Sequence, residues 1–194
     1  RIKNISANVY EAALDRLRSL FERFDTVFVS FSGGKDSTIV LNLTLEVADE
    51  MGKGPVHVLF VDEEVNTPQT IEYMHRINKR PNVKLKWCCL PILHRNACSR
   101  EETWWTCWDP EAQDRWVTKM PNVPELVTVE DVPKFKTGMK LPDVGSIVFG
   151  PEYGTVADCA GIRAQESPRR MKSVLRKKED NYIADPLHGY YYYC

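Results

Sequence analysis

The stretch TVFVSFSGGKDS, residues 26–37, joins an apolar run to a turn that is rich in glycine and hydroxyl groups. Its first part, residues 26–30, is continuously apolar, which is typical of a strand buried inside a parallel sheet. Gly33 and Gly34 let the backbone pass close to an anion, and the residues that follow predict a helix that begins at the turn. Backbone amides, the positive end of the helix dipole and Lys35 would then face one site. This stretch therefore predicts a phosphate-binding turn between a strand and a helix.

The rest of the chain alternates between helical and strand patterns. Apolar residues at helical spacing, or in short continuous runs bounded by Gly and Pro, define each segment. We expect helices at 9–24, 35–51 and 68–79, strands at 26–30, 55–61 and 83–90, a short helix that begins within 94–98, renewed regular structure at 146–149 and a basic helix at 168–178. This order predicts an α/β fold, a Rossmann-like parallel sheet with helices on both faces. Ligands of such sheets bind at the carboxyl ends of the strands.

Residues 100–145 interrupt this alternation. Tryptophans and prolines are concentrated there without a clear period, so we expect an irregular insertion or lid within a single domain that spans residues 1–194. The tryptophans are Trp104, Trp105, Trp108 and Trp116. Packing of the irregular segment is the simpler interpretation of them, and stacking on a bound base is the alternative.

Length and charge limit the classes of function. The chain has 194 residues and a formal net charge of −1, which argues against general binding to nucleic acid. No apolar run approaches the length that spans a bilayer, and no signal peptide is evident, so we expect a cytoplasmic protein without a membrane partner. The chain begins at Arg1 without methionine and ends in the apolar run YYYYC. We therefore expect it to be the N-terminal part of a longer protein.

The six cysteines do not form the pattern of a disulfide-rich domain. Cys89, His94, Cys98 and Cys107 are soft ligands that zinc accepts, but their spacing matches no common zinc site. Buried, reduced thiols are the simpler interpretation. The sequence therefore predicts no metal site in the protein.

Two separated signatures resemble those of a known family. Residues 32–37, SGGKDS, are similar to the S-G-G-x-D-S loop of the PP-loop ATP pyrophosphatase and adenine nucleotide alpha-hydrolase-like (HUP-type) superfamily. Residues 161–169, GIRAQESPR, and Asp62 at the end of the second expected strand resemble the phosphoadenosine phosphosulfate (PAPS) reductase family within it. Residues 87–121 resemble a subgroup associated with co-activation of prophage gene expression.

This resemblance implies a set of site residues. The loop would hold phosphate or sulfate, the backbone at Phe60 and Val61 would meet the adenine edge, and Asp62 would lie near the ribose. An equally simple role for Asp62 is to cap the turn after its strand. The implied catalytic residues are Lys35 and Asp36. The implied nucleotide-binding residues are Ser30, Ser32, Gly33, Gly34, Lys35, Asp36, Ser37, Phe60, Val61, Asp62, Gly161, Arg163 and Arg169.

The resemblance also implies an activity. We expect an adenine-nucleotide-binding protein that cleaves ATP to AMP and pyrophosphate or adenylates an acceptor, with Mg²⁺ brought by ATP. One alternative is reduction of PAPS or adenosine phosphosulfate, or sulfur transfer. The sequence lacks the Glu-Cys-Gly triplet of the reductases and a Cys-x-x-Cys pair for an iron-sulfur cluster. Another alternative is a non-enzymatic nucleotide sensor that acts through a protein partner.

Overall fold

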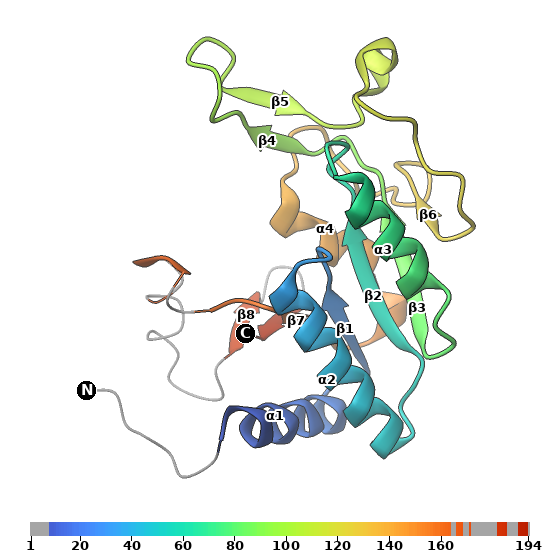
Figure 1. Ribbon diagram of the computed structural model, residues 1–194, viewed down its shortest axis with the longest axis vertical. Helices are drawn as coiled ribbons and strands as arrows, with labels where there is room; N and C mark the ends of the chain where they lie inside the picture. Colours follow the sequence, from blue (N-terminus) through green and yellow to red (C-terminus); the bar gives the residue numbers. More distant parts are fainter. Residues whose placement is uncertain (1–7, 164–165, 169–170, 172–181, 186–189, 194) are drawn as a thin grey trace.

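The computed structural model describes residues 8–163, 166–168, 171, 182–185 and 190–193 (Figure 1). These residues form a seven-stranded sheet. Its strands are β1 (Thr26–Ser30), β2 (Val56–Val61), β3 (Val83–Cys88), β6 (Leu126–Val127), β7 (Val156–Ala160), β8 (Tyr182–Asp185) and β9 (Tyr190–Tyr193). The spatial order is β6-β3-β2-β1-β7-β9-β8, and every neighbouring pair is parallel except β8 with β9. The predicted α/β fold with a parallel sheet is confirmed.

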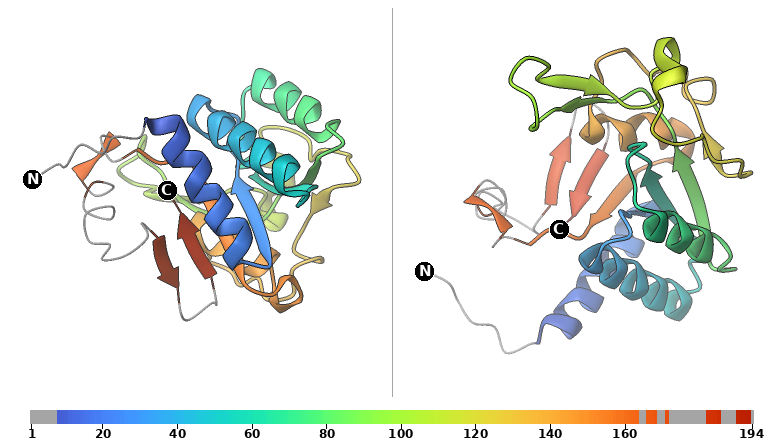
Figure 2. Two further views of the ribbon diagram at one scale, coloured as in Figure 1. Left: turned by 90° about the horizontal axis from the view of Figure 1, so that it is seen from below. Right: turned by 45° about the horizontal axis from the view of Figure 1, so that its top comes forward.

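Helices cover both faces of this sheet. They are α1 (Val9–Arg23), α2 (Lys35–Met51), α3 (Pro68–Asn78) and α4 (Leu141–Val148). Figure 2 shows α1, α2 and α3 on one face and α4 on the other. Because the strands between them are buried on both faces, they consist of apolar runs such as Val27, Phe28 and Val29 in β1, which are all 5% exposed or less.

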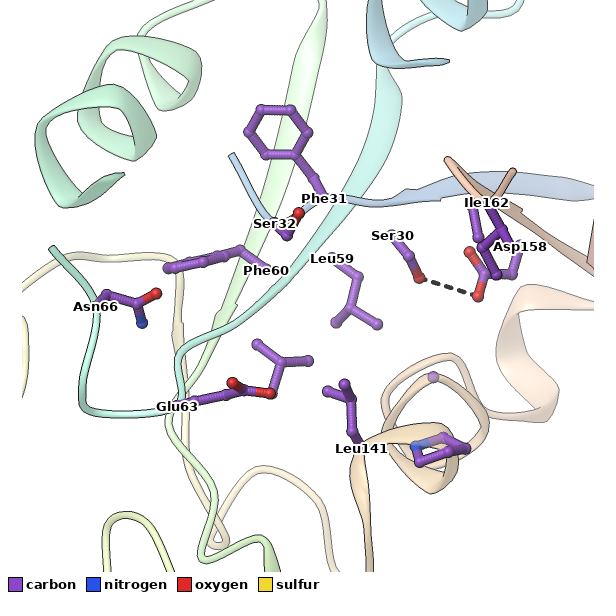
Figure 3. Close-up of a pocket in the computed structure, with 14 residues that line it drawn as sticks. Ser30, Phe31, Ser32, Leu59, Phe60, Glu63, Asn66, Leu141, Asp158 and Ile162 are labelled. Carbon is purple, nitrogen blue, oxygen red and sulfur yellow. Dashed lines mark hydrogen bonds between the residues drawn. The ribbon is translucent and has the colours of Figure 1, made fainter. Parts of the chain in front are cut away.

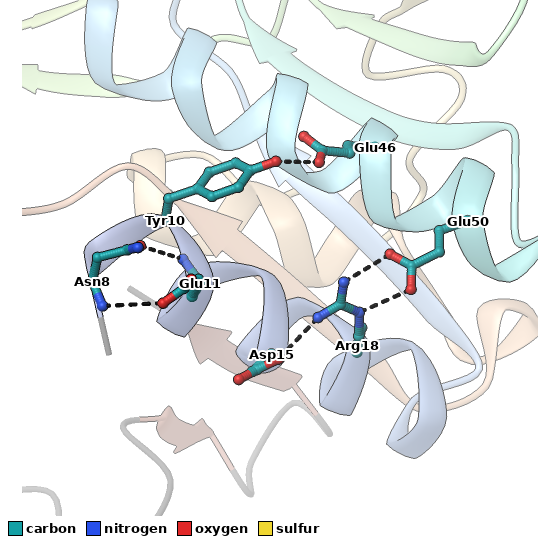
Figure 4. Close-up of polar contacts among 7 residues, drawn as sticks. All are labelled: Asn8, Tyr10, Glu11, Asp15, Arg18, Glu46 and Glu50. Carbon is teal, nitrogen blue, oxygen red and sulfur yellow. Dashed lines mark hydrogen bonds and ion pairs between the residues drawn. The ribbon is translucent and has the colours of Figure 1, made fainter. Parts of the chain in front are cut away.

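The first two helices pack against each other along their length. Leucines of α1 face the core, while Arg18 donates to both carboxylate oxygens of Glu50 at 2.9 and 3.1 Å, and Tyr10 donates to Glu46 (Figure 4). These polar contacts are exposed to solvent, and exposed ion pairs typically add less than about 1 kcal/mol. The buried leucine face is therefore what holds α1 in place.

One local expectation fails in the structure, and one strand was not expected. Residues 94–98 do not begin a helix, because β4 (Leu93–Arg95) pairs with the antiparallel strand β5 (Trp104–Thr106) and His94 stacks on Trp105 with ring centroids 5.1 Å apart. The regular structure expected at 146–149 is confirmed by α4, which ends at Val148 with Phe149 as its C-cap. Strand β7, which lies between α4 and the loop at Gly161, was not expected.

The segment 100–145 is irregular in part. It contains β5, the 3₁₀ turn η1 (Pro110–Arg115) and β6, and β6 extends the main sheet beside β3. A second 3₁₀ turn, η2 (Pro151–Tyr153), precedes β7. Figure 1 shows the β4–β5 hairpin beyond the carboxyl ends of β1 and β2. Within the described part of the chain, no helix has both the length and the apolar character needed to cross a membrane.

Candidate functional site

The sheet places a pocket where its strand order reverses. From β1 the chain continues to β2 and β3 on one side, while β7 pairs with β1 on the other side. A reversal of this kind opens a crevice at the carboxyl ends of the strands. A cavity of about 360 Å³ lies there (Figure 3). Its described lining residues are Ser30, Phe31, Ser32, Leu59, Phe60, Val61, Glu63, Asn66, Leu141, Pro142, Gly145, Asp158, Ala160 and Ile162.

The pocket walls are largely apolar with a few polar groups. Leu141 and Pro142, which are exposed, offer apolar surfaces suited to a flat ring, as in most small-molecule sites. Ser30, the last residue of β1, donates a hydrogen bond of 2.9 Å to Oδ2 of Asp158 on β7. Asp158 is 3% exposed, so this bond joins the two central strands at the pocket floor.

The glycine turn lies next to this pocket. Gly33 has a φ of +76°, which glycine adopts without strain, and Gly34 is the N-cap of α2. Gly34 has no side chain to accept from the first-turn amides, and the hydroxyls of Ser37 and Thr38 donate instead to its carbonyl oxygen at 3.0 and 2.8 Å. The amides at the start of α2 are thus without a side-chain cap, which is the arrangement that binds anions.

Charged side chains surround the same turn. Nζ of Lys35 lies 2.6 Å from Oδ1 of Asp36, and Nε of Arg163 lies 3.4 Å from Oδ2. The hydrogen bond from Lys35, aided by the charge of Arg163, holds the pKa of Asp36 below its ordinary value. The side chains of Lys35 and Arg163 are 68% and 58% exposed, so both cations are accessible to an anionic ligand.

The lack of a side chain at Gly161 allows the second signature segment, which begins at this residue, to contact the first at Asp36 and Ser37. A Cβ atom built at Gly161 would lie 2.8 Å from the carbonyl carbon of Asp36 and from the amide nitrogen of Ser37. Only glycine therefore allows the end of β7 to pack directly on the start of α2. The structure brings Gly161 and Arg163 to the turn that lies about 125 residues earlier in the chain, as the two-signature pattern predicts.

The side chain of Asp62 lies in a different environment from the ribose contact that the resemblance implies. Its side chain is buried, Oδ1 accepts from the backbone N–H of Glu64 and from Asn66 at 2.9 Å each, and Oδ2 accepts from the indole of Trp87 at 2.9 Å. These contacts match the capping alternative. Asp62 is not a lining residue of the pocket, whereas its neighbour Glu63 is.

The other predicted site residues fall into three groups. Ser30, Ser32, Phe60 and Val61 line the pocket, and the loop from Gly33 to Ser37 adjoins it. Arg169 lies outside the described residues. The lining residues that sequence reasoning missed are Phe31, Leu59, Glu63, Asn66, Asp158, Ala160, Ile162 and those of α4. Of these residues, only Glu63 could have been identified from the sequence as a candidate, because it follows the apolar second strand together with Asp62.

The cysteines form no metal site in the part of the chain that is described, where no three His, Cys, Asp or Glu side chains are placed to hold an ion. Sγ of Cys107 lies 3.4 Å from Nε2 of His94, but Cys98 is exposed. Burial raises the pKa of Cys88 and of Cys107 to about 12 and also raises that of Cys89. These buried, protonated thiols agree with the packing interpretation.

Comparison with known proteins supports one family. Residues 26–187 match the model of the phosphoadenosine phosphosulfate reductase domain. The uncharacterized protein YbdN of Escherichia coli K12 is 31% identical over 189 residues, which are 92% of this chain and 44% of that protein. This chain therefore spans less than half the length of that relative.

A solved structure with a similar arrangement is the phosphate complex of phosphoadenylyl-sulfate (PAPS) reductase from Candida auris. It has a TM-score of 0.49 and 15% sequence identity, and the match covers 98% of this chain and 80% of that one. The resemblance to the prophage co-activator subgroup stays a prediction. By the extent of the family-model match and the identity to YbdN, the chain belongs to the phosphoadenosine phosphosulfate reductase domain family.

Proposed function

We propose that this protein binds an adenine nucleotide, with the phosphates at residues 32–37 and the nucleoside in the pocket. The observation that carries the proposal is the position of the uncapped start of α2 beside a largely apolar cavity at the strand-order reversal. The phosphates would meet the free amides, Lys35 and Arg163. The backbone at Phe60 and Val61 would border the adenine ring.

The chemistry that we propose is cleavage of ATP between the α and β phosphates. A water or an acceptor hydroxyl attacks the α phosphorus and releases its proton to solvent, the bond to the bridging oxygen breaks, and pyrophosphate leaves with its electron pair. Lys35 would stabilise the charge that develops on pyrophosphate, and the α2 amides would hold it in line. Asp36 offers one carboxylate, which suits Mg²⁺ because this ion keeps several waters and binds mainly phosphate oxygens. When bound, Mg²⁺ would add further charge neutralisation.

Replacement of the loop cation tests this chemistry. We expect Lys35→Ala to lower the rate of pyrophosphate release by roughly 100-fold, because loss of one preorganised donor costs about 3 kcal/mol of transition-state stabilisation. Lys53→Ala is the matched control, since Lys53 is an exposed lysine just beyond the other end of α2. Circular dichroism of both variants checks folding. Unchanged pyrophosphate release in Lys35→Ala would defeat the mechanism.

Family membership favours a second candidate, reduction of a sulfonucleotide. That reaction requires a thiol that attacks the sulfate sulfur, and no cysteine lines the pocket among the described residues. A third candidate is a nucleotide sensor that acts through a protein partner. Calorimetric titration with ATP, adenosine phosphosulfate and PAPS, followed by product analysis, separates the three. Pyrophosphate indicates the first, thioredoxin-dependent sulfite the second, and binding without product the third.

A further inference from the structure

The pocket and the loop beside it differ in charge. Glu63 and Asp158 are the only charged residues among the described pocket-lining residues, and both are acidic. Lys35 and Arg163 lie at the glycine turn and are not lining residues. The two cations of the described site thus lie at the glycine turn, where both contact Asp36 and Arg163 also lies 3.7 Å from Glu166, whereas the charged lining residues of the pocket are acidic.

The carboxylate of Glu63 faces the cavity. Its side chain is 41% exposed, and Figure 3 shows the carboxylate pointing into the space between the end of β2 and Leu141. Nδ1 of His94 lies 3.9 Å from Oε1 of Glu63, and Nε2 of the same ring lies 3.4 Å from Sγ of Cys107. His94 therefore lies beside Glu63 without being a lining residue of the pocket.

Asn66 adds a second acceptor on the same wall. Its amide nitrogen donates to Oδ1 of Asp62 at 2.9 Å, which fixes the amide and leaves its carbonyl oxygen to accept. A wall formed by a carboxylate and an amide oxygen suits a ligand group that donates hydrogen bonds. It disfavours a ligand group that carries negative charge.

Resting on the proposed function, we propose that Glu63 binds the ribose hydroxyls and selects adenine nucleotides whose 2′ and 3′ positions carry no phosphate. Two adjacent hydroxyls can both donate to one carboxylate, and an acidic residue after the second strand has this role in dinucleotide-binding folds. A 3′-phosphate would bring about two negative charges next to Glu63 and remove a donor. The site thereby accepts ATP or adenosine phosphosulfate and rejects PAPS.

Paired ligands that differ only in the 3′-phosphate test this selectivity. Adenosine 5′-phosphosulfate is compared with PAPS, and AMP with adenosine 3′,5′-bisphosphate, by calorimetry at constant ionic strength. We expect the wild type to bind the unphosphorylated ribose more tightly by about tenfold or more, since a difference of about 1.4 kcal/mol gives that ratio. In Glu63→Gln, which keeps the shape but removes the charge, the ratio should fall to less than about threefold.

A matched variant and a second ligand pair complete the experiment. Glu22→Gln removes the same charge from an exposed position near the end of α1, which precedes the amino end of β1, and should keep the wild-type ratio. Because 2′,3′-dideoxy-AMP lacks the hydroxyl donors, the wild type should bind it more weakly than AMP, and this measurement requires no variant.

The possible results separate this inference from the function on which it rests. Equal affinity for both members of each pair, or an unchanged ratio in Glu63→Gln, would overturn the assignment of Glu63 while nucleotide binding stands. Failure of every nucleotide to bind would overturn the proposed function and this inference together. A reduced ratio in Glu63→Gln, with Glu22→Gln like the wild type, supports Glu63 as the selecting residue.

Discussion

Because Gly161 has no side chain, the end of β7 can approach the glycine turn closely. A Cβ atom there would meet backbone atoms of Asp36 and Ser37 at 2.8 Å, and backbone atoms cannot rotate away as a side chain can. We expect Gly161→Ala to push the start of α2 out of place and to weaken ATP binding by roughly 10- to 100-fold, because small displacements of a positioned group have effects of that size. Isothermal titration calorimetry measures the change.

Gly54→Ala serves as the control for this substitution. A Cβ at Gly54 would meet nothing closer than Oδ1 of Asp49 at 4.0 Å, so the change in chain entropy is similar but no contact is disturbed. The two variants should therefore differ strongly in ATP affinity. Equal affinity for ATP in Gly161→Ala and in the wild type would contradict the argument from the close contact.

The residues of the glycine turn could be predicted because their role depends on local chain geometry. Gly33 adopts a positive φ and Gly34 is the N-cap of α2, as the sequence pattern indicates. The contrast between Asp62 and Glu63 could not be predicted, because the turn after β2 decides which of two adjacent carboxylates faces the cavity. The position of Asp158 at the pocket could not be predicted either, since it depends on the pairing of β7 with β1.

Among the connecting elements, the loop after β2 anchors the tryptophan-rich segment, which lies within residues 100–145. Glu64 is 4% exposed, has a φ of +69°, and its carboxylate accepts from the backbone N–H groups of Trp108 and Val117 at 2.7 Å each. The indole of Trp108 also donates to the backbone oxygen of Asp62. These contacts agree with the packing interpretation of Trp108.

Glu64→Gln should therefore loosen this segment. The amide has only one oxygen to accept, so one of the two backbone donors loses its partner, and we expect a loss of about 2 kcal/mol in the free energy of unfolding. Denaturant unfolding followed by tryptophan fluorescence measures it. Glu111→Gln, an exposed change on η1, is the control and should have little effect. Equal stability of the two variants would show that the buried carboxylate does not hold the segment.

Local signals predicted some elements and missed others. Strand β1 and the capping of α3 by Thr67 follow from an apolar run and from a Thr-Pro pair, both of which act within a few residues. The helix expected at 94–98 was wrong because β4 depends on a partner strand about ten residues away. Strand β7 was missed because Asp158 interrupts its apolar run, although neighbouring strands on both sides satisfy its backbone.

For the molecule as a whole, the alternation of helix and strand predicted the parallel sheet but not its strand order. The reversal at β1 depends on β7, which joins the sheet only after about 70 residues that follow β3. On the same sheet, His57 of β2 is half-buried, and its ring meets Phe149 and Tyr153 edge-on with centroids 5.7 and 5.5 Å away. Burial, together with the charges of Lys84 and Lys86, lowers the pKa of His57 to about 4.

This half-buried histidine should make the unfolding free energy depend on pH. In the unfolded chain the pKa of His57 returns to about 6.5, so between that value and about 4 the unfolded state binds a proton that the folded state lacks. Stability should fall as the pH falls through this window, by roughly 1–2 kcal/mol after allowance for partial exposure. His57→Phe, which keeps the edge-on contacts, should lose this component in denaturant unfolding at pH 7, 6, 5 and 4. His75→Phe, on the exposed side of α3, should keep it, and a wild-type pH slope in His57→Phe would refute the assignment.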